Sequence, residues 1–153
     1  ETALTCAVTS TSAMYGPAQE FKGDVWMETR QKVKHIQSHT FEVWVKPDCT
    51  SCAIMSLPGG GCLAIDRNGS LAVQPPSGEL WASSCKLSKS HFNNVAHSLG
   101  TDLGEVLYMN GEVCLNRTAP QVNSSENVDF VISVGFCSKH AGFKQFKGLV
   151  DQA

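Results

Sequence analysis

The segment GCLAIDRNGSLAV, residues 61–73, constrains the fold most strongly, because its turn residues and its apolar residues agree on one register. A two-residue loop at Asn68-Gly69 would send the large apolar side chains of the two arms to opposite faces of the hairpin. A three-residue loop over 67–69, with Gly69 in the left-handed region, puts them on one face instead. The pairs that then share a buried face are Ile65 with Leu71 and Leu63 with Val73. We therefore expect a β-hairpin with a type I turn and a glycine bulge.

A second hairpin is predicted in the segment EVLYMNGEVCL, residues 105–115, around Asn110-Gly111. Asn-Gly is a preferred pair for a two-residue type I′ turn, in which both residues adopt positive φ. The cross-strand pairs expected from this loop length are Tyr108 with Val113, Val106 with Leu115 and, on the other face, Leu107 with Cys114.

The segment HTFEVWVKP, residues 39–47, is predicted to form a strand with one core face. That face carries Phe41, Val43 and Val45. Pro47 ends the run because it has no amide hydrogen to donate to a neighbouring strand. Trp44 falls on the opposite face, so we expect that face to be partly covered too.

Weaker strand signals lie at 20–27, 86–99 and 128–136. The segment 86–99 is also compatible with a helix, but its Asn93-Asn94 pair and its short apolar run favour a strand. Short apolar or alternating runs separated by Gly, Pro, Asn and Ser recur along the whole chain, and helical periodicity is hard to find. The chain is therefore predicted to be all-β, a sandwich or a barrel.

Cysteines and N-glycosylation acceptors together indicate an oxidising, glycosylating compartment, so we expect a secreted or cell-surface protein. The seven cysteines are Cys6, Cys49, Cys52, Cys62, Cys85, Cys114 and Cys137. The three Asn-X-Ser/Thr acceptors are Asn68, Asn116 and Asn123. We predict that at least one acceptor carries a glycan in a secretory host.

The CTSC segment at 49–52 could be a redox dithiol or half of a zinc site. A redox motif should open a helix, whereas this segment follows a predicted strand and a proline, and the remaining Cys and His residues match zinc spacings poorly. Disulfide half-cystines are the preferred interpretation. We predict three disulfides and one odd thiol, with a bridge among Cys49, Cys52 and Cys62.

Charge and hydropathy narrow the class of partner. The net charge is −2 with 17% charged residues and no basic run, which gives no electrostatic footprint for nucleic acid or an anionic membrane. No apolar run approaches the roughly 20 residues of a membrane span, so direct membrane insertion is not expected. The 153 residues fit a single domain over 1–153, which we interpret as a fragment of a larger extracellular protein.

Four motifs resemble, in family order, those of the laminin G-like domains within the concanavalin A-like jelly-roll class. HTFEVWVKP at 39–47 resembles the "FT.E.WVKP" strand, and LAIDRNGSLAV at 63–73 resembles the "L.ID.NG.L.F" hairpin. The stretch FNNVAHSL…GEVLYMNGEVC within 92–114 is similar to "W.HVA……G...LYVNG..V", and FKGLVDQA at 146–153 to the closing "F.G.IDEV". The resemblance implies two antiparallel sheets of about six or seven strands each, packed face to face. The chain departs from the family in its high cysteine count and in His91-Phe92, where a tryptophan is usual.

The resemblance also raises the question of glycosidase activity, because many jelly-roll domains of this class are glycosidases. Glycosidases of this class need two facing carboxylates, and their usual "E.D..E" arrangement is absent. The nearest carboxylate pairs, Glu126 with Asp129 and Glu105 with Glu112, are interpreted as solvated surface, and the scattered histidines as structural or surface residues. We therefore expect no enzyme activity and no required cofactor.

Calcium is the one metal that the resemblance suggests, because laminin G-like domains often hold it with oxygen ligands. Asp151 matches the aspartate of the closing motif, and Asp24 is its candidate partner. An exposed or salt-bridged carboxylate is the alternative for each.

Exposed aromatic rings are the candidates for ligand binding. Of Trp26, Trp44 and Trp81, the last is the best because it follows the Pro-Pro-Ser-Gly loop, with buried packing as the alternative. The sequence thus predicts a non-catalytic recognition or adhesion module that binds a protein or carbohydrate at a cell surface or in the extracellular matrix. The alternative is a structural domain that docks against other domains of the same chain. A large exposed apolar patch would favour docking, and a groove with Trp81 and polar groups would favour ligand binding.

Overall fold

The computed structural model describes residues 8–10, 18–24, 26–28, 38–57, 61–76, 78–100, 104–118, 132–137 and 142–151. All regular structure within these ranges is β-strand, in two antiparallel sheets. The seven-stranded sheet, in spatial order, consists of β1 (Val8–Ser10), β2 (Ala18–Lys22), β13 (Lys147–Asp151), β4 (His39–Pro47), β9 (Asn93–Gly100), β10 (Gly104–Met109) and β11 (Glu112–Arg117). The six-stranded sheet consists of β3 (Met27–Glu28), β12 (Ser133–Val134), β5 (Cys52–Ser56), β6 (Cys62–Ile65), β7 (Ser70–Gln74) and β8 (Trp81–Lys86).

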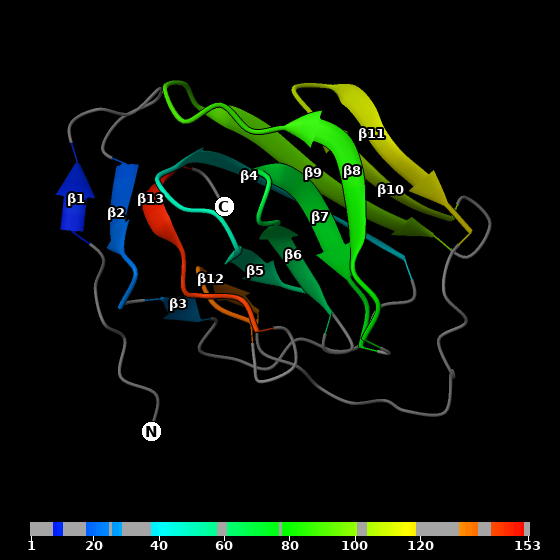
Figure 1. The fold of residues 1–153 in the computed structure, drawn as a ribbon, viewed down its shortest axis with the longest axis horizontal. Helices are drawn as coiled ribbons and strands as arrows, with labels where there is room; N and C mark the ends of the chain where they lie inside the picture. Colours follow the sequence, from blue (N-terminus) through cyan, green and yellow to red (C-terminus); the bar gives the residue numbers. More distant parts are fainter. Residues whose placement is uncertain are drawn as a thin grey trace.

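The two sheets pack face to face as a jelly-roll sandwich, as the resemblance to laminin G-like domains implied (Figure 1). The edge strands β8 and β11 lie side by side, so the two sheets meet along that side of the molecule. In the described part of the chain, no helix has the length and apolar character needed to cross a membrane.

The core lies between the sheets and is built from alternating residues of both. Buried apolar residues of the seven-stranded sheet include Phe21, Val43, Val45, Val95, Leu107 and Val150, and those of the six-stranded sheet include Ile54, Leu63, Ile65, Leu71 and Val73. Phe146, which enters β13, packs edge-to-face on Phe21 with ring centroids 6.0 Å apart. The predicted strand at 39–47 is confirmed as β4, with its expected core face inside and Trp44 half-buried on the other face.

The hairpin β6–β7 has the predicted register. Ile65 pairs with Leu71 and Leu63 with Val73, and Gly69 has a φ of 83°. The carboxylate of Asp66 accepts hydrogen bonds from the backbone amides of Asn68 and Ser70, both at 2.8 Å. The Asp66 side chain thus provides acceptors for two backbone amides of the turn, which explains why an aspartate precedes the loop.

The hairpin β10–β11 differs from its predicted register beyond the turn. Both turn residues have positive φ, as a type I′ turn requires, and Tyr108 pairs with Val113 as expected. A β-bulge then shifts the ladder, so that Leu107 pairs with Leu115 and not with Cys114. The bulge leaves Cys114 outside the ladder and aims its side chain at β8, where it bonds to Cys85. The predicted pairing of Val106 with Leu115 is therefore wrong by one residue, because Val106 pairs with Asn116.

Segment 86–99 is not helical, in agreement with the prediction, and its second half forms β9. The loop before β9 is fixed by Asn93, whose amide donates to the carbonyl oxygens of Val45 and Ser88 at 3.1 and 2.9 Å. The carboxamide oxygen of Asn93 in turn accepts from the Ser88 amide at 2.9 Å. In the predicted strand at 128–136, only 132–136 is described, and it contributes the short β12.

Three disulfides connect six of the seven cysteines, and Cys6 lies outside the described residues. The pairs are Cys49–Cys52, Cys62–Cys137 and Cys85–Cys114. The second holds the segment after β12 against the outer face of the six-stranded sheet, where Ala53, Ala64 and Phe143 form a small second cluster. This cover explains why both faces of β5 and β6 are buried.

Candidate functional site

Trp81 begins β8 at the line where the two sheets meet. It pairs with the buried Val73, so its side chain is on the face toward the other sheet, yet 40% of the residue is exposed. The guanidinium carbon of Arg117, on β11, lies 4.9 Å from the centre of the indole ring. This is a cation–π contact between the two sheets. Its aromatic partner, Trp81, is one of the few large apolar side chains exposed on the described surface.

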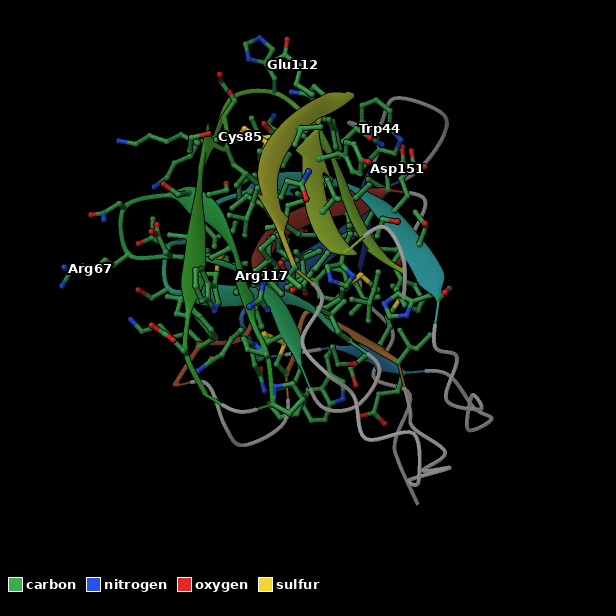
Figure 2. The ribbon with its side chains drawn as sticks, turned by 90° about the vertical axis from the view of Figure 1, so that its right-hand side faces the viewer. Trp44, Arg67, Cys85, Glu112, Arg117 and Asp151 are labelled. Atoms are coloured by element: carbon green, nitrogen blue, oxygen red, sulfur yellow. A yellow bond between two sulfur atoms is a disulfide. The ribbon has the colours of Figure 1, made fainter. Side chains whose placement is uncertain are left out.

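Arg117 is itself held from the interior by Glu105, on the adjacent strand β10. Its Nε donates to Glu105 Oε2 at 2.6 Å, and its Nη2 lies 2.5 Å from the same oxygen. The other carboxylate oxygen, Oε1, is 2.8 Å from Nε2 of His97 on β9. All three side chains are largely buried, with exposures of 15% for Arg117, 5% for Glu105 and 2% for His97. Figure 2 shows Arg117 directed from β11 toward the interior.

The pKa of the Glu105 carboxyl lies below its ordinary value of 4.5. Burial alone would raise this pKa, but the hydrogen bond from His97 and the positive charges of His97 and Arg117 outweigh the effect of burial. Glu105 is therefore a carboxylate at neutral pH, and it fixes the position of Arg117.

The network continues away from Trp81 to His39 on β4. The His39 ring stacks at 5.3 Å on the ring of His97 and at 4.9 Å on that of Phe41. The contacts run from the exposed Trp81 through Arg117 and Glu105 to the buried His97, and they end at the half-buried His39 at the start of β4. Because each side chain contacts the next, the indole is supported from the interior through Arg117 and Glu105.

Glu105 corrects one expectation from the sequence. It was interpreted as solvated surface, but it is 4% exposed and ion-paired, whereas Glu112 is exposed at the turn (Figure 2). Cross-strand pairing of Glu105 with Arg117 brings them together, and that register includes the bulge that the sequence did not reveal. The sequence did contain a signal for the burial of Glu105. Glu105 lies two residues from the core residue Leu107, and alternate residues of a strand lie on the same face. The other pair, Glu126 with Asp129, lies outside the described residues.

The two remaining tryptophans are less accessible. Trp26 is half-buried, donates its Nε1 hydrogen to Glu28 at 2.8 Å and packs against Phe136 with ring centroids 5.0 Å apart. Trp44 is half-buried on the outer face of the seven-stranded sheet, where it pairs with Asp151 (Figure 2). Trp81 is the most exposed of the three candidates, as the sequence argument favoured.

The two aspartates suggested for calcium do not meet. Asp24 follows β2 at the end where Lys22 pairs with Lys147, while Asp151 ends β13 one residue beyond the pair Val150 with Gln19. The length of β2 from Ala18, the position opposite Asp151, to Lys22 lies between the two aspartates, on the order of 13 Å. No group of three or more metal-binding side chains is found in the described ranges. A site shared by Asp24 and Asp151 is therefore incompatible with the register, and calcium binding stays a prediction.

Two of the three glycosylation acceptors lie on described surface. Asn68 is exposed at the tip of the β6–β7 hairpin, and Asn116 is exposed on β11. Asn123 lies outside the described residues. Both described acceptors are open to solvent, and their occupancy stays a prediction.

No protein-family model matches this chain, and no curated protein sequence matches it. Solved structures do resemble it. Domain 4 of AbnA, a GH43 extracellular arabinanase from Geobacillus stearothermophilus solved with arabinotriose, has a TM-score of 0.66 at 19% identity, over 95% of this chain and 72% of that one. The native heptameric SAP-like pentraxin from Limulus polyphemus has a TM-score of 0.63 at 14% identity, over 99% and 76%.

A third similar structure is the binding domain of Paraclostridial Mosquitocidal Protein 1, with a TM-score of 0.64 at 11% identity, over 99% of this chain and 43% of that chain. At these identities the likeness establishes the jelly-roll β-sandwich fold and not the activity.

Proposed function

We propose that this protein is a non-catalytic extracellular recognition module, and that it binds a carbohydrate or a protein through the surface around Trp81. The observation that carries the proposal is the partly exposed indole, backed by Arg117 and, through it, by the buried Glu105. A ring held in this way loses little conformational freedom on binding, so more of its contact energy is available to the complex. Indole rings suit both ligand classes, because they combine a large apolar surface with one polar group.

We also propose that the chain belongs to the laminin G-like branch of the jelly-roll folds. Its four motifs coincide with strands of the structure: β4, the hairpin β6–β7, the three strands β9 to β11, and β13. The similar structures support the fold at the coarser level of the sandwich. Secretion or display at the cell surface is part of the same proposal, and three disulfides in a chain of this size support it.

The alternative function is assembly, in which the same surface docks against another domain of a larger chain. Leu80 precedes Trp81 and is 41% exposed, so two large apolar side chains are adjacent at this edge. A docking surface normally covers a larger contiguous apolar area than two residues offer, and this favours ligand recognition.

The experiment is a screen of the 153-residue chain on a glycan array and against candidate cell-surface proteins, with the Trp81→Ala and Trp81→Phe variants. We expect Ala to lower affinity at least tenfold and Phe to lower it less, because Phe keeps a ring for stacking. Val113→Ala is the matched control, because Val113 is another exposed apolar residue at 58% exposure. Thermal melts of each variant confirm folding.

Two results would reject the proposal. If the native chain binds nothing in any screen but associates tightly with a neighbouring domain, the assembly function would be favoured. Glycosidase turnover that disappears on changing one carboxylate to its amide would make the protein an enzyme.

A further inference from the structure

The disulfide between Cys49 and Cys52 lies in the turn from β4 to β5, away from the surface around Trp81. It closes a much shorter loop than the other two bridges do. The sequence separations are 3, 29 and 75 residues for Cys49–Cys52, Cys85–Cys114 and Cys62–Cys137. This bond therefore ties together residues that the turn already brings close, whereas the other two join distant parts of the chain.

The short loop means that the fold gains little stability from this bond. In the chain-entropy model, the contribution of a cross-link to the folding equilibrium constant grows as the 3/2 power of the length of the loop that it closes. Cys49–Cys52 should then contribute about 30-fold less than Cys85–Cys114, which joins edge strands of different sheets. The protein can lose the bond at Cys49 and remain folded.

Backbone hydrogen bonds hold the same turn without the disulfide. The amide of Asp48 donates to the carbonyl oxygen of Lys147 at 2.8 Å. The carbonyl oxygen of Ser51 accepts from the amide of Lys144 at 2.8 Å, and the carbonyl oxygen of Lys144 accepts from the amide of Ala53 at 2.9 Å. These bonds fix both sides of Ser51, which has a positive φ of 52° that is uncommon for a residue with a Cβ. The turn therefore keeps its shape in both redox forms.

The two sulfur atoms differ in access. Cys52 begins β5 inside the core and is 0% exposed, whereas Cys49 is half-buried at the edge of the core. Thiol–disulfide exchange requires that the attacking thiolate reach one of the two sulfurs. An external thiolate can therefore attack Sγ of Cys49, and the buried Cys52 is then the leaving group.

The surroundings of Cys49 suit both the disulfide and the thiol. The amide of Lys147 donates to Cys49 Sγ at 3.3 Å, and the carbonyl oxygen of Lys147 lies 3.3 Å from the same sulfur, where it can accept from a thiol. Lys147 and the exposed Lys144 belong to the segment that is hydrogen-bonded to this turn. Lys147 is paired with Asp48 at 3.2 Å, but Lys144 makes no ion pair among the described side chains. Positive charge of this kind favours the approach of an anionic thiolate.

We propose that Cys49–Cys52 is a reactive disulfide that exchanges with low-molecular-weight thiols, and that the thiol is captured on Cys49. The thiolate sulfur forms a new S–S bond with Cys49 Sγ. The bond to Cys52 breaks, and its electron pair leaves on the Cys52 sulfur, which takes a proton from water. A second thiolate then attacks the small-molecule sulfur of the mixed disulfide and releases Cys49. Two small thiols have thus become one small disulfide, and the protein holds a dithiol.

The reaction is stoichiometric, and it goes beyond the function proposed for the Trp81 surface. A β-strand follows the motif, so the electrostatic activation that a helix N-terminus gives to a catalytic thiol does not operate here. The exchange requires neither Trp81 nor its ligand. Trp81→Ala should therefore leave the exchange rate unchanged, and failure of one proposal leaves the other standing.

The first test follows reduction of the native 153-residue chain by reduced glutathione at about pH 8, where part of a small thiol is thiolate. Thiols that are already free are blocked beforehand with N-ethylmaleimide, and those that appear later are labelled with iodoacetamide and located by peptide mapping. We expect Cys49 and Cys52 to be labelled first, at least tenfold faster than the buried pair Cys62 and Cys137. Earlier reaction of another bridge, or no label on Cys49 and Cys52, would overturn the proposal.

A matched pair of variants tests which sulfur is attacked. Both carry Cys6→Ser, and each keeps one cysteine of the motif, Cys49 in Cys52→Ser and Cys52 in Cys49→Ser. With oxidised glutathione, Cys52→Ser should form its glutathione adduct at least tenfold faster, because Cys52 is the buried partner. Equal rates would contradict the assignment of Cys49 as the site of capture.

Thermal melts test whether the bond is dispensable for the fold. Cys49→Ala/Cys52→Ala should lower the melting temperature by about 5 °C or less, and Cys85→Ala/Cys114→Ala by about twice as much, as their loop lengths require. A larger loss from the first double variant than from the second would show that Cys49–Cys52 is a structural bridge, and it would overturn the proposal.

Discussion

Replacing Glu105 with Gln tests whether the buried network supports the sandwich as described. The change keeps the shape of the side chain and removes its charge, so Arg117 and His97 lose their shared partner. Breaking a buried ion pair from one side costs about 3–5 kcal/mol. We expect about 3 kcal/mol, the lower end, because Arg117 is 15% exposed and water can reach it.

The measurement is the free energy of unfolding from urea titrations at pH 7 with the disulfides intact. Glu112→Gln is the control, since Glu112 is exposed at the β10–β11 turn, and its cost should stay within about 0.5 kcal/mol. A double-mutant cycle with Arg117→Met isolates the pairwise energy between the two charges. Equal costs for the Glu105 and Glu112 variants would refute the reasoning.

The same variant predicts a pH dependence. Because the pKa of Glu105 is lowered by folding, its stabilisation is fully present above the ordinary value of 4.5 and is lost as pH falls through the lower, folded pKa. The difference in unfolding free energy between the native chain and Glu105→Gln should therefore be constant from pH 7 to about 5 and shrink in more acidic solution. A difference that grows on acidification would show that another group controls the effect.

Three further predictions concern other parts of the molecule. Gly148→Ala should destabilise the protein by about 2 kcal/mol or more, measured by urea unfolding, because the new Cβ meets backbone of β4 at positive φ; an unchanged midpoint would contradict this. Replacing Cys85 and Cys114 with Ala should cost about 3 kcal/mol in the same assay, given a loop of 29 residues; a loss below about 1 kcal/mol would mean that β8 and β11 associate without the bridge. Expression in a secretory host should give a mass that falls on enzymatic deglycosylation, with Asn68→Gln removing part of the difference; an unshifted mass would rule out glycan occupancy.

The sequence predicted those elements whose signals are local and mutually consistent. In β6–β7 the turn residues and the apolar pattern require the same register, and the structure has it. In β10–β11 the turn was predicted correctly but the ladder beyond it was not. The ladder is shifted by a bulge that directs Cys114 toward Cys85, 29 residues earlier in the chain, with which it forms a disulfide. Within the hairpin only Cys114 signals this requirement, and a cysteine alone does not identify its partner.

The candidate site was predictable only in part for a related reason. Trp81 follows a turn-rich loop, and its exposure could be anticipated from that position. Its support could not, because Arg117, Glu105 and His97 come from three other strands and become partners only through the sheet register. The pairing of Cys62 with Cys137, 75 residues apart, is hidden from the sequence in the same way.

The joining of β8 to β11 also determines how the molecule can associate with copies of itself. An edge strand with unpaired backbone groups is a template for strand addition and for aggregation. Here the edge strand of one sheet is covalently linked to the edge strand of the other, so neither is readily approached by a second chain. The opposite edges of the described sheets are β1 and β3, of which three and two residues are described. Reduction of Cys85–Cys114 would remove the covalent link between the two longer edge strands, so this bond protects both edges against strand addition.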